Sequence, residues 1–188
     1  GYAAQTHTVW LRAESGLPLT TIINAGNAAS HLAALAKGLV ALQQSDLPTT
    51  SALGMAEQLE EIGDKVQKLA HALPDLAPML HRRLADLCKD GQRLVPIQPR
   101  LIHGDFHIRQ LLADHGEIVF LDFDEFALGD PLRDVANFVV DLHYADFAPD
   151  FVRQMMVSFL KSYRQSADFV LDADRLRWQL RYLFLTKA

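Results

Sequence analysis

The chain has 188 residues, of which 49% are hydrophobic and 22% are charged. These proportions are typical of a folded globular protein and exclude disordered, collagen-like and low-complexity chains. The net charge of −5 argues against nucleic-acid binding through bulk positive charge and gives no support for attraction to a membrane surface.

The N-terminal half is predicted to hold a short strand and three helices. A β-type run at Val9–Arg12 ends at the Ser-Gly-Leu-Pro segment of residues 15–18. Apolar residues then recur at steps of three and four, which is typical of amphipathic helices that pack on a core. This pattern predicts helices over Leu32–Leu42, Leu59–Leu73 and Leu76–Leu87.

The single cysteine, and the lack of a transmembrane or signal segment in the sequence, indicate the cellular compartment in which the protein is expected. Cys88 has no partner for an intrachain disulfide, and its helical spacing from Leu84 and Leu87 predicts a small core residue. No apolar run reaches the roughly 18 residues of a transmembrane helix. The start of the chain also lacks the basic and apolar regions of a signal peptide. We therefore expect a cytoplasmic protein that binds neither nucleic acid nor membrane.

The pattern changes after Pro96. The next segments predict a small, hairpin-sized β element with strands at Leu101–Ile102, Leu111–Leu112 and Ile118–Leu121, and a turn at Asp114–Gly116 between the last two. An N-cap acid and a proline, Asp130-Pro131, then begin another helix. The remaining helices are predicted over Leu132–Leu142, Phe151–Tyr163 and Asp174–Thr186. The predicted fold class is α+β, mainly helical, with one domain over residues 1–188.

Side chains that carry chemistry concentrate between His103 and Asp134. His103-Gly104-Asp105 is followed five residues later by Gln110, and Asp122 comes about a dozen residues after that, at the end of a strand. Such oxygen ligands suit Mg²⁺, which takes one or two carboxylates and completes its shell with phosphate and water. The spacing matches a kinase catalytic loop, in which the first aspartate accepts a hydroxyl proton and the amide and second aspartate hold the metal.

Together these motifs resemble the aminoglycoside phosphotransferase and choline kinase family, small-molecule kinases with a protein-kinase-like fold. The family pattern is H-G-D-x-H-x-x-N, then a hydrophobic residue with D-[FW]-[DEG], then G-D-P-x-x-D. The chain matches it except at Gln110, where asparagine is usual. Glutamine keeps the amide oxygen and adds a methylene, and related branches of the family carry it.

The resemblance covers nearly the whole chain but only one lobe of the family's two. It implies a C-terminal lobe whose small β-hairpin carries the catalytic loop, with residues 1–16 as hinge or linker. The chain holds no glycine-rich phosphate loop and no lysine on a strand. We therefore expect the N-terminal lobe to be absent from this chain, and the chain by itself to be inactive.

Each candidate residue has a role and a simpler alternative. Asp105 is expected to be the catalytic residue, although a turn acid after Gly104 is the alternative. Gln110 and Asp122 are expected to hold the metal. Since Asp122 follows four residues that we expect to be buried, an unpaired carboxylate there would be costly. Asp124 is a candidate near the metal, or else caps the loop.

Two further residues are expected to support the loop. The ring of His103 is predicted to bond to nearby backbone, and Asp134, in the first turn of a helix, resembles the family acid that anchors the catalytic loop. His103, Asp105 and His107 could instead form a zinc triad, although ligands two residues apart are unusual for zinc.

The residues and the resemblance together predict an ATP- and Mg²⁺-dependent phosphotransferase that acts on a hydroxyl of a small molecule. Two alternatives stay open. One is a catalytically silent pseudokinase or binding module. The other is a metal-dependent phosphoesterase built on the histidines and Asp105.

Overall fold

The computed structural model describes residues 2–3, 8–9 and 15–187. Most of the described residues lie in helices and the described strands are short, which confirms the α+β, mainly helical fold class. Of the predicted N-terminal strand, Val9 lies in β2 (Thr8–Val9), which pairs antiparallel with β1 (Tyr2–Ala3). The rest of that strand, Trp10–Arg12, lies outside the described residues.

The predicted helices all form. The described α-helices are α1 (Leu19–Ile22), α2 (Ala28–Gln44), α3 (Met55–Ala72), α4 (Ala77–Gly91), α5 (Leu132–Tyr144), α6 (Pro149–Ser166) and α7 (Ala173–Thr186). Helix α3 ends just before Pro74, as expected because a proline disfavours helical geometry in the residue before it. None of the helices in the described ranges is long and apolar enough to cross a membrane.

Cys88 lies near the end of α4, which extends four residues further than the leucine pattern predicts. Its side chain is only partly buried, whereas the sequence predicts a fully buried core cysteine. The buried face of α4 includes Leu80 and Leu87, and Cys88 lies at the edge of that face.

Two small sheets hold the loops together. The predicted hairpin consists of β6 (Leu111–Asp114) and β7 (Glu117–Phe120), and β3 (Leu17–Pro18) pairs with β6 on its other side. In the second sheet, β8 (Ala127–Gly129) lies between β5 (Arg100–Ile102), which runs antiparallel to it, and β4 (Ala52–Leu53), which runs parallel. β4 and β8 were not predicted, because their pairing joins segments far apart in the sequence.

Helix α5 begins one residue later than the sequence predicts, because Pro131 and not Asp130 occupies the N-cap position. Oδ1 of Asp130 accepts a hydrogen bond from the backbone N–H of Leu132 at 2.9 Å, which supplies one of the partners that a helix start requires. The same carboxylate also pairs with Arg175 on α7 at 3.0 Å, a contact that no local pattern indicates.

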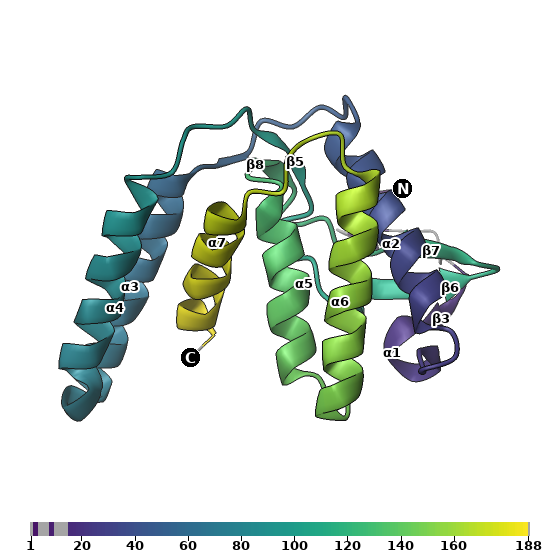
Figure 1. The fold of residues 1–188 in the computed structure, drawn as a ribbon. Coiled ribbons are helices and arrows are strands. Elements are labelled where there is room, and N and C mark those ends of the chain that lie inside the picture. The colour runs from purple at the N-terminus through teal and green to yellow at the C-terminus, as the bar shows by residue number, and fades with distance from the viewer. Residues whose placement is uncertain (1, 4–7, 10–14, 188) are drawn as a thin grey trace.

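Helix α5 lies between two hydrophobic cores, with α6 on one side and α7 on the other (Figure 1). Leu132, Val135, Phe138 and Leu142 join the core that α2 and α6 complete. Ala136 and Val140 join the core formed with α3, α4 and α7. The polar residues of α5 that are nevertheless buried are Asp134, Asn137 and Asp141. A rigid helix thus presents a row of polar groups in the interior, where each needs a partner.

Candidate active site

The segment His103–Gln110 connects β5 to β6 and turns sharply at Gly104. This glycine has φ of +89°, in the left-handed region that residues with a Cβ atom seldom adopt. A Cβ atom at this position would lie 2.2 Å from the carbonyl oxygen of Glu125. The absence of a side chain therefore lets the loop lie directly against the segment that follows Asp122.

A buried carboxylate on α5 holds the start of this loop. Oδ2 of Asp134 accepts a hydrogen bond from the backbone N–H of His103 at 2.8 Å, and Oδ1 accepts one from Gly104 at 3.0 Å. Burial raises the pKa of Asp134 to about 6, while the two backbone hydrogen bonds favour the charged form. Asp134 is therefore ionised at neutral pH, and the backbone N–H groups of His103 and Gly104 stabilise its negative charge.

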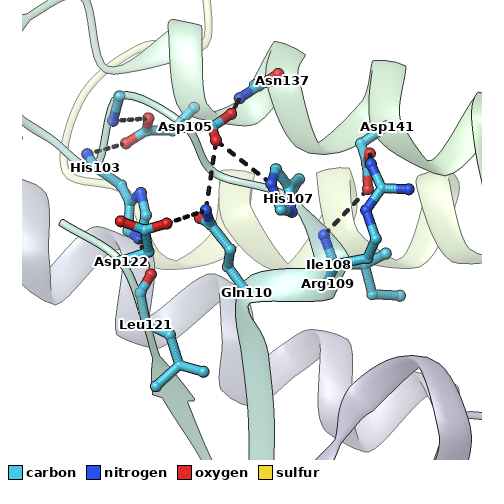
Figure 2. A network of polar contacts seen from close by, with 12 residues as sticks. His103, Asp105, His107, Ile108, Arg109, Gln110, Leu121, Asp122, Asn137 and Asp141 are labelled. Atoms are coloured by element: carbon cyan, nitrogen blue, oxygen red, sulfur yellow. Dashed lines mark hydrogen bonds and ion pairs between the residues drawn. The ribbon is translucent and has the colours of Figure 1, made fainter. Parts of the chain in front are cut away.

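Asp105 lies at the centre of a polar network (Figure 2). One carboxylate oxygen accepts a hydrogen bond from Nδ2 of Asn137 at 3.2 Å, and the other lies 3.4 Å from Nε2 of His107. The hydrogen bond from His107 is the main cause that lowers the pKa of Asp105 to about 2. Burial opposes it, and the hydrogen bond from Asn137 contributes further to the lowering. Its side chain is 46% exposed, so this charged oxygen pair is open to a partner from solution.

The amide of Gln110 bridges the two acids expected at the site. Its Nε2 donates to Oδ2 of Asp122 at 3.1 Å and lies 3.4 Å from Oδ2 of Asp105. Figure 2 shows the three side chains converging from the loop and from the end of β7. The structure thus brings Asp105, Gln110 and Asp122 together.

The environment of Asp122 differs from the prediction. The side chain is exposed and the strand before it is only half-buried, because β7 is an edge strand of its sheet. The argument that a buried carboxylate here needs a metal partner is therefore wrong. A different signal marks the residue: its φ of +62° is left-handed, a conformation that costs energy for a non-glycine residue and is enriched at functional sites.

His103 ties the loop to the strand before Asp122. The ring is fully buried, and its Nε2 lies 2.8 Å from the backbone carbonyl oxygen of Leu121. Since a carbonyl oxygen only accepts hydrogen bonds, Nε2 carries the proton. Burial lowers the pKa of His103, which keeps the ring neutral. The ring packs on Phe106 and Phe123. Within the described residues, His103, Asp105 and His107 do not form a group that could hold a metal, which disfavours the phosphoesterase alternative.

Asp124 is exposed in the turn after Asp122. Within the described ranges, no hydrogen bond or ion pair joins it to Asp105, Gln110 or Asp122. The structure therefore does not bring Asp124 into the network.

Two residues of the network were not predicted. Besides Asn137, which bonds to Asp105, Asp141 accepts hydrogen bonds from the backbone N–H of Ile108 at 3.2 Å and from Nη2 of Arg109 at 2.7 Å. Together with Asp134, these residues occur at steps of three and four on α5, the spacing of one helix face. That face of α5 holds the loop at both ends and in the middle. Three polar residues spaced along one face of an otherwise apolar helix are the sequence signal from which this role of α5 could have been predicted.

The donor set fits a hard cation bound together with phosphate. Asp122 offers carboxylate oxygens, and Oε1 of Gln110 is buried without a hydrogen-bond partner. The amide nitrogen of Gln110 faces the acids here, so the amide has to turn over before its oxygen reaches a metal at Asp122. No group of three or more His, Cys, Asp or Glu side chains within the described ranges could hold a metal, so a cation at Asp122 and Gln110 would need substrate oxygens and water as its other ligands.

A model of the phosphotransferase enzyme family matches residues 6–175 of the chain. No curated protein is a significant match.

Solved structures of small-molecule kinases share the fold. An aminoglycoside phosphotransferase, APH(3'')-Id from Streptomyces rimosus, superposes with a TM-score of 0.70 at 22% identity over 92% of this chain and 67% of its own. An aminoglycoside-3'-phosphotransferase of type VIII gives 0.67 at 21% identity, over 92% of this chain and 66% of its own. A glucosamine kinase gives 0.61 at 21% identity, over 84% of this chain and 47% of its own. The chain thus spans between about half and two thirds of the length of these proteins.

Proposed function

The chain belongs to the phosphotransferase enzyme family, and on that premise we propose that it transfers the γ-phosphate of ATP to a hydroxyl group of a small molecule with the help of Mg²⁺. The observation that carries the proposal is the Gln110 amide, which lies within 3.4 Å of both Asp105 and Asp122. The residue proposed as proton acceptor and the residue proposed as metal ligand thereby lie side by side, as phosphoryl transfer requires.

Asp105 would orient the acceptor hydroxyl. Its pKa of about 2 makes it a fully ionised but weak base at neutral pH. It would therefore accept a hydrogen bond from the hydroxyl and receive the proton only as the bond to phosphorus forms. Since the transition state of phosphoryl transfer is loose, the attacking oxygen needs little activation in advance.

Gln110 and Asp122 are the residues that would hold Mg²⁺. When bound, the ion supplies positive charge that neutralises the phosphate oxygens of the nucleotide. Asp134 and His103 would act through the backbone: the first holds the turn before Asp105, and the second holds the carbonyl before Asp122.

The acceptor is proposed only as a hydroxylated small molecule. The same Streptomyces rimosus enzyme has been crystallised in complex with ADP and streptomycin, and glucosamine kinase with glucosamine, ADP and inorganic phosphate. Both compounds carry hydroxyl groups. These complexes support an acceptor of that kind and ATP as the donor.

We also propose that residues 1–188 form the C-terminal, substrate-binding lobe of a two-lobed enzyme in the cytoplasm, with residues 1–16 as the hinge. The greater length of the matched kinases supports this. A lobe that holds a nucleotide from one side buries less of it than the 70–90% usual for small-molecule sites. We therefore expect the chain alone to bind ATP at millimolar concentration or weaker and to transfer no phosphate.

The test is phosphorus NMR of ATP incubated with Mg²⁺, the two-lobed protein and a panel of hydroxylated compounds that includes an aminoglycoside and an amino sugar. The proposal predicts a new phosphate ester with at least one compound. Binding of Mg²⁺–ATP without transfer to any compound would favour a silent pseudokinase. Hydrolysis of phosphate esters with a transition metal and no nucleotide would favour the phosphoesterase.

A further inference from the structure

A buried polar pair joins the ends of helices α2 and α6, away from the catalytic loop. Gln43 lies next to the last residue of α2 and is 3% exposed, and Tyr163 lies in the last turn of α6 and is fully buried. The hydroxyl of Tyr163 donates a hydrogen bond to Oε1 of Gln43 at 2.6 Å. Tyr163 belongs to the apolar core that α2, α5 and α6 share, where polar groups are costly unless they are bonded. Two apolar side chains would fill this space without that cost, so the pair indicates a role other than packing.

The other end of the Gln43 amide is bonded to the start of α5. Its Nε2 donates to the backbone carbonyl of Pro131, the residue before the helix, at 2.9 Å. A carbonyl oxygen only accepts, so the amide nitrogen faces Pro131 and the amide oxygen faces Tyr163. Burial, followed by the negative charge of Asp134, raises the pKa of Tyr163, which keeps its hydroxyl protonated and able to donate. The pair thus connects α6 to α2, and α2 to the start of α5.

The same amide supports the carboxylate that anchors the catalytic loop. Burial raises the pKa of Asp134 to about 6, and the side chain of Gln43 is one of the groups that oppose this rise. Nε2 of Gln43 carries two hydrogens, of which the bond to Pro131 uses one. On its other side, Asp134 accepts hydrogen bonds from the backbone of His103 and Gly104. Asp134 is therefore held between Gln43 and the turn that leads to Asp105.

We propose that Gln43 and Tyr163 are positioning residues for Asp105, an inference that rests on the proposed phosphate transfer. They hold Asp134 and the start of α5, and thereby determine where the loop places the Asp105 carboxylate. Since Asp105 acts on the reacting hydroxyl, weakening this support lowers the turnover number and leaves the KM for ATP unchanged.

Two buried tyrosines provide a matched test. Tyr163→Phe removes one hydroxyl and keeps the ring. Tyr182→Phe is the control: Tyr182 is 1% exposed, and its hydroxyl donates to Oε2 of Glu61 at the same distance of 2.6 Å, in the core formed with α3, α4 and α7. Each variant loses a hydrogen bond of the same length, but only Tyr163 is joined through Gln43 to the residue before α5.

The first measurement is the steady-state kinetics of phosphate transfer by the two-lobed protein. Tyr163→Phe should lower the turnover number about two- to tenfold, the range of one hydrogen bond, at an unchanged KM for ATP. Gln43→Met removes both bonds at similar side-chain length and should lower the turnover number further. Tyr182→Phe should leave both parameters unchanged. An equal turnover number in the two tyrosine variants would overturn the proposal, even if Gln43→Met fails to fold.

The second measurement does not depend on activity. In amide NMR spectra of the 188-residue chain, Tyr163→Phe should shift the signals of His103 and Gly104, whose N–H groups bond to Asp134. Tyr182→Phe should leave these signals in place. Unshifted signals in Tyr163→Phe would overturn the proposal whatever the activity of the enzyme. Shifted signals, in a protein whose wild type transfers no phosphate, would support the link from Tyr163 to the loop and refute the proposed function.

Discussion

Two glycines offer a direct test of how the Asp105 loop is built. Gly104 and Gly116 have nearly the same backbone angle, with φ of +89° and +91°. Their surroundings differ. A Cβ atom at Gly104 would lie 2.2 Å from the carbonyl oxygen of Glu125 and 2.5 Å from its Cβ, whereas a Cβ atom at Gly116 meets nothing within 4 Å. Substitution by alanine therefore separates backbone strain from steric overlap.

The expected cost follows from these two parts. A left-handed conformation destabilises a residue with a Cβ atom by about 1–2 kcal/mol, and this applies to both sites. At Gly104 the backbone at Glu125 must also move, and overpacking of this kind costs about 1–3 kcal/mol more. We therefore expect a loss of unfolding free energy of about 2–5 kcal/mol for Gly104→Ala and about 1–2 kcal/mol for Gly116→Ala.

Urea denaturation of both variants measures the difference. Melting temperatures should follow at about 2–4 °C per kcal/mol for a chain of this length. Amide NMR signals of the segment after Asp122 should also shift in Gly104→Ala and stay in place in Gly116→Ala. Equal destabilisation by the two substitutions would refute the claim that the loop rests on the Glu125 backbone.

The remaining predictions concern the charged groups of the site. His107→Gln should raise the pKa of Asp105 from about 2 toward its usual value, because the hydrogen bond from His107 is the main cause of the low value. Carbon NMR titration of the Asp105 carboxyl measures this pKa. An unchanged pKa would contradict the role given to the hydrogen bond from His107. Asp122→Ala should abolish Mg²⁺-dependent nucleotide binding in the two-lobed protein while Gln110→Asn preserves it, as calorimetry would report; undiminished binding by Asp122→Ala would make that residue a mere strand-end acid. Burial raises the pKa of Asp134 to about 6, above the unfolded value near 3.8, so its contribution to stability is full below about pH 4 and is lost as the pH rises through 6. Compared with Asp134→Asn, the wild type should therefore lose up to about 3 kcal/mol between pH 4 and 7 in urea denaturation, and a difference that is constant with pH would refute this.

Much of the site was predictable because its residues are close together in the sequence. Asp105, Gln110 and Asp122 lie on one loop and one hairpin, so their spacing largely determines that they meet. The helices were predictable for a related reason, since the leucine pattern reports the buried face of each helix directly. The second sheet was not, because the pairing of β4 with β8 depends on how segments far apart in the sequence pack together.

The contacts made by α5 show where local patterns stop being informative. Asn137 and Asp141 read as polar residues in an apolar helix until packing brings the loop against them. Asp130 was predicted as a helix cap, but its pairing with Arg175 depends on where α7 packs. Asp122 was expected to follow a buried strand and is instead exposed, because strand periodicity does not show whether a strand lies at the edge of its sheet.

The central claim is that Asp105 accepts the proton of the hydroxyl that attacks the γ-phosphate. Its most direct test is the rate of phosphate transfer from ATP by the Asp105→Asn variant of the two-lobed protein, at saturating Mg²⁺ and with an acceptor found in the compound panel. The account predicts a loss of about 10²–10⁴-fold in turnover with unchanged folding, as expected for removal of a general base. Turnover within about threefold of the wild type would contradict it.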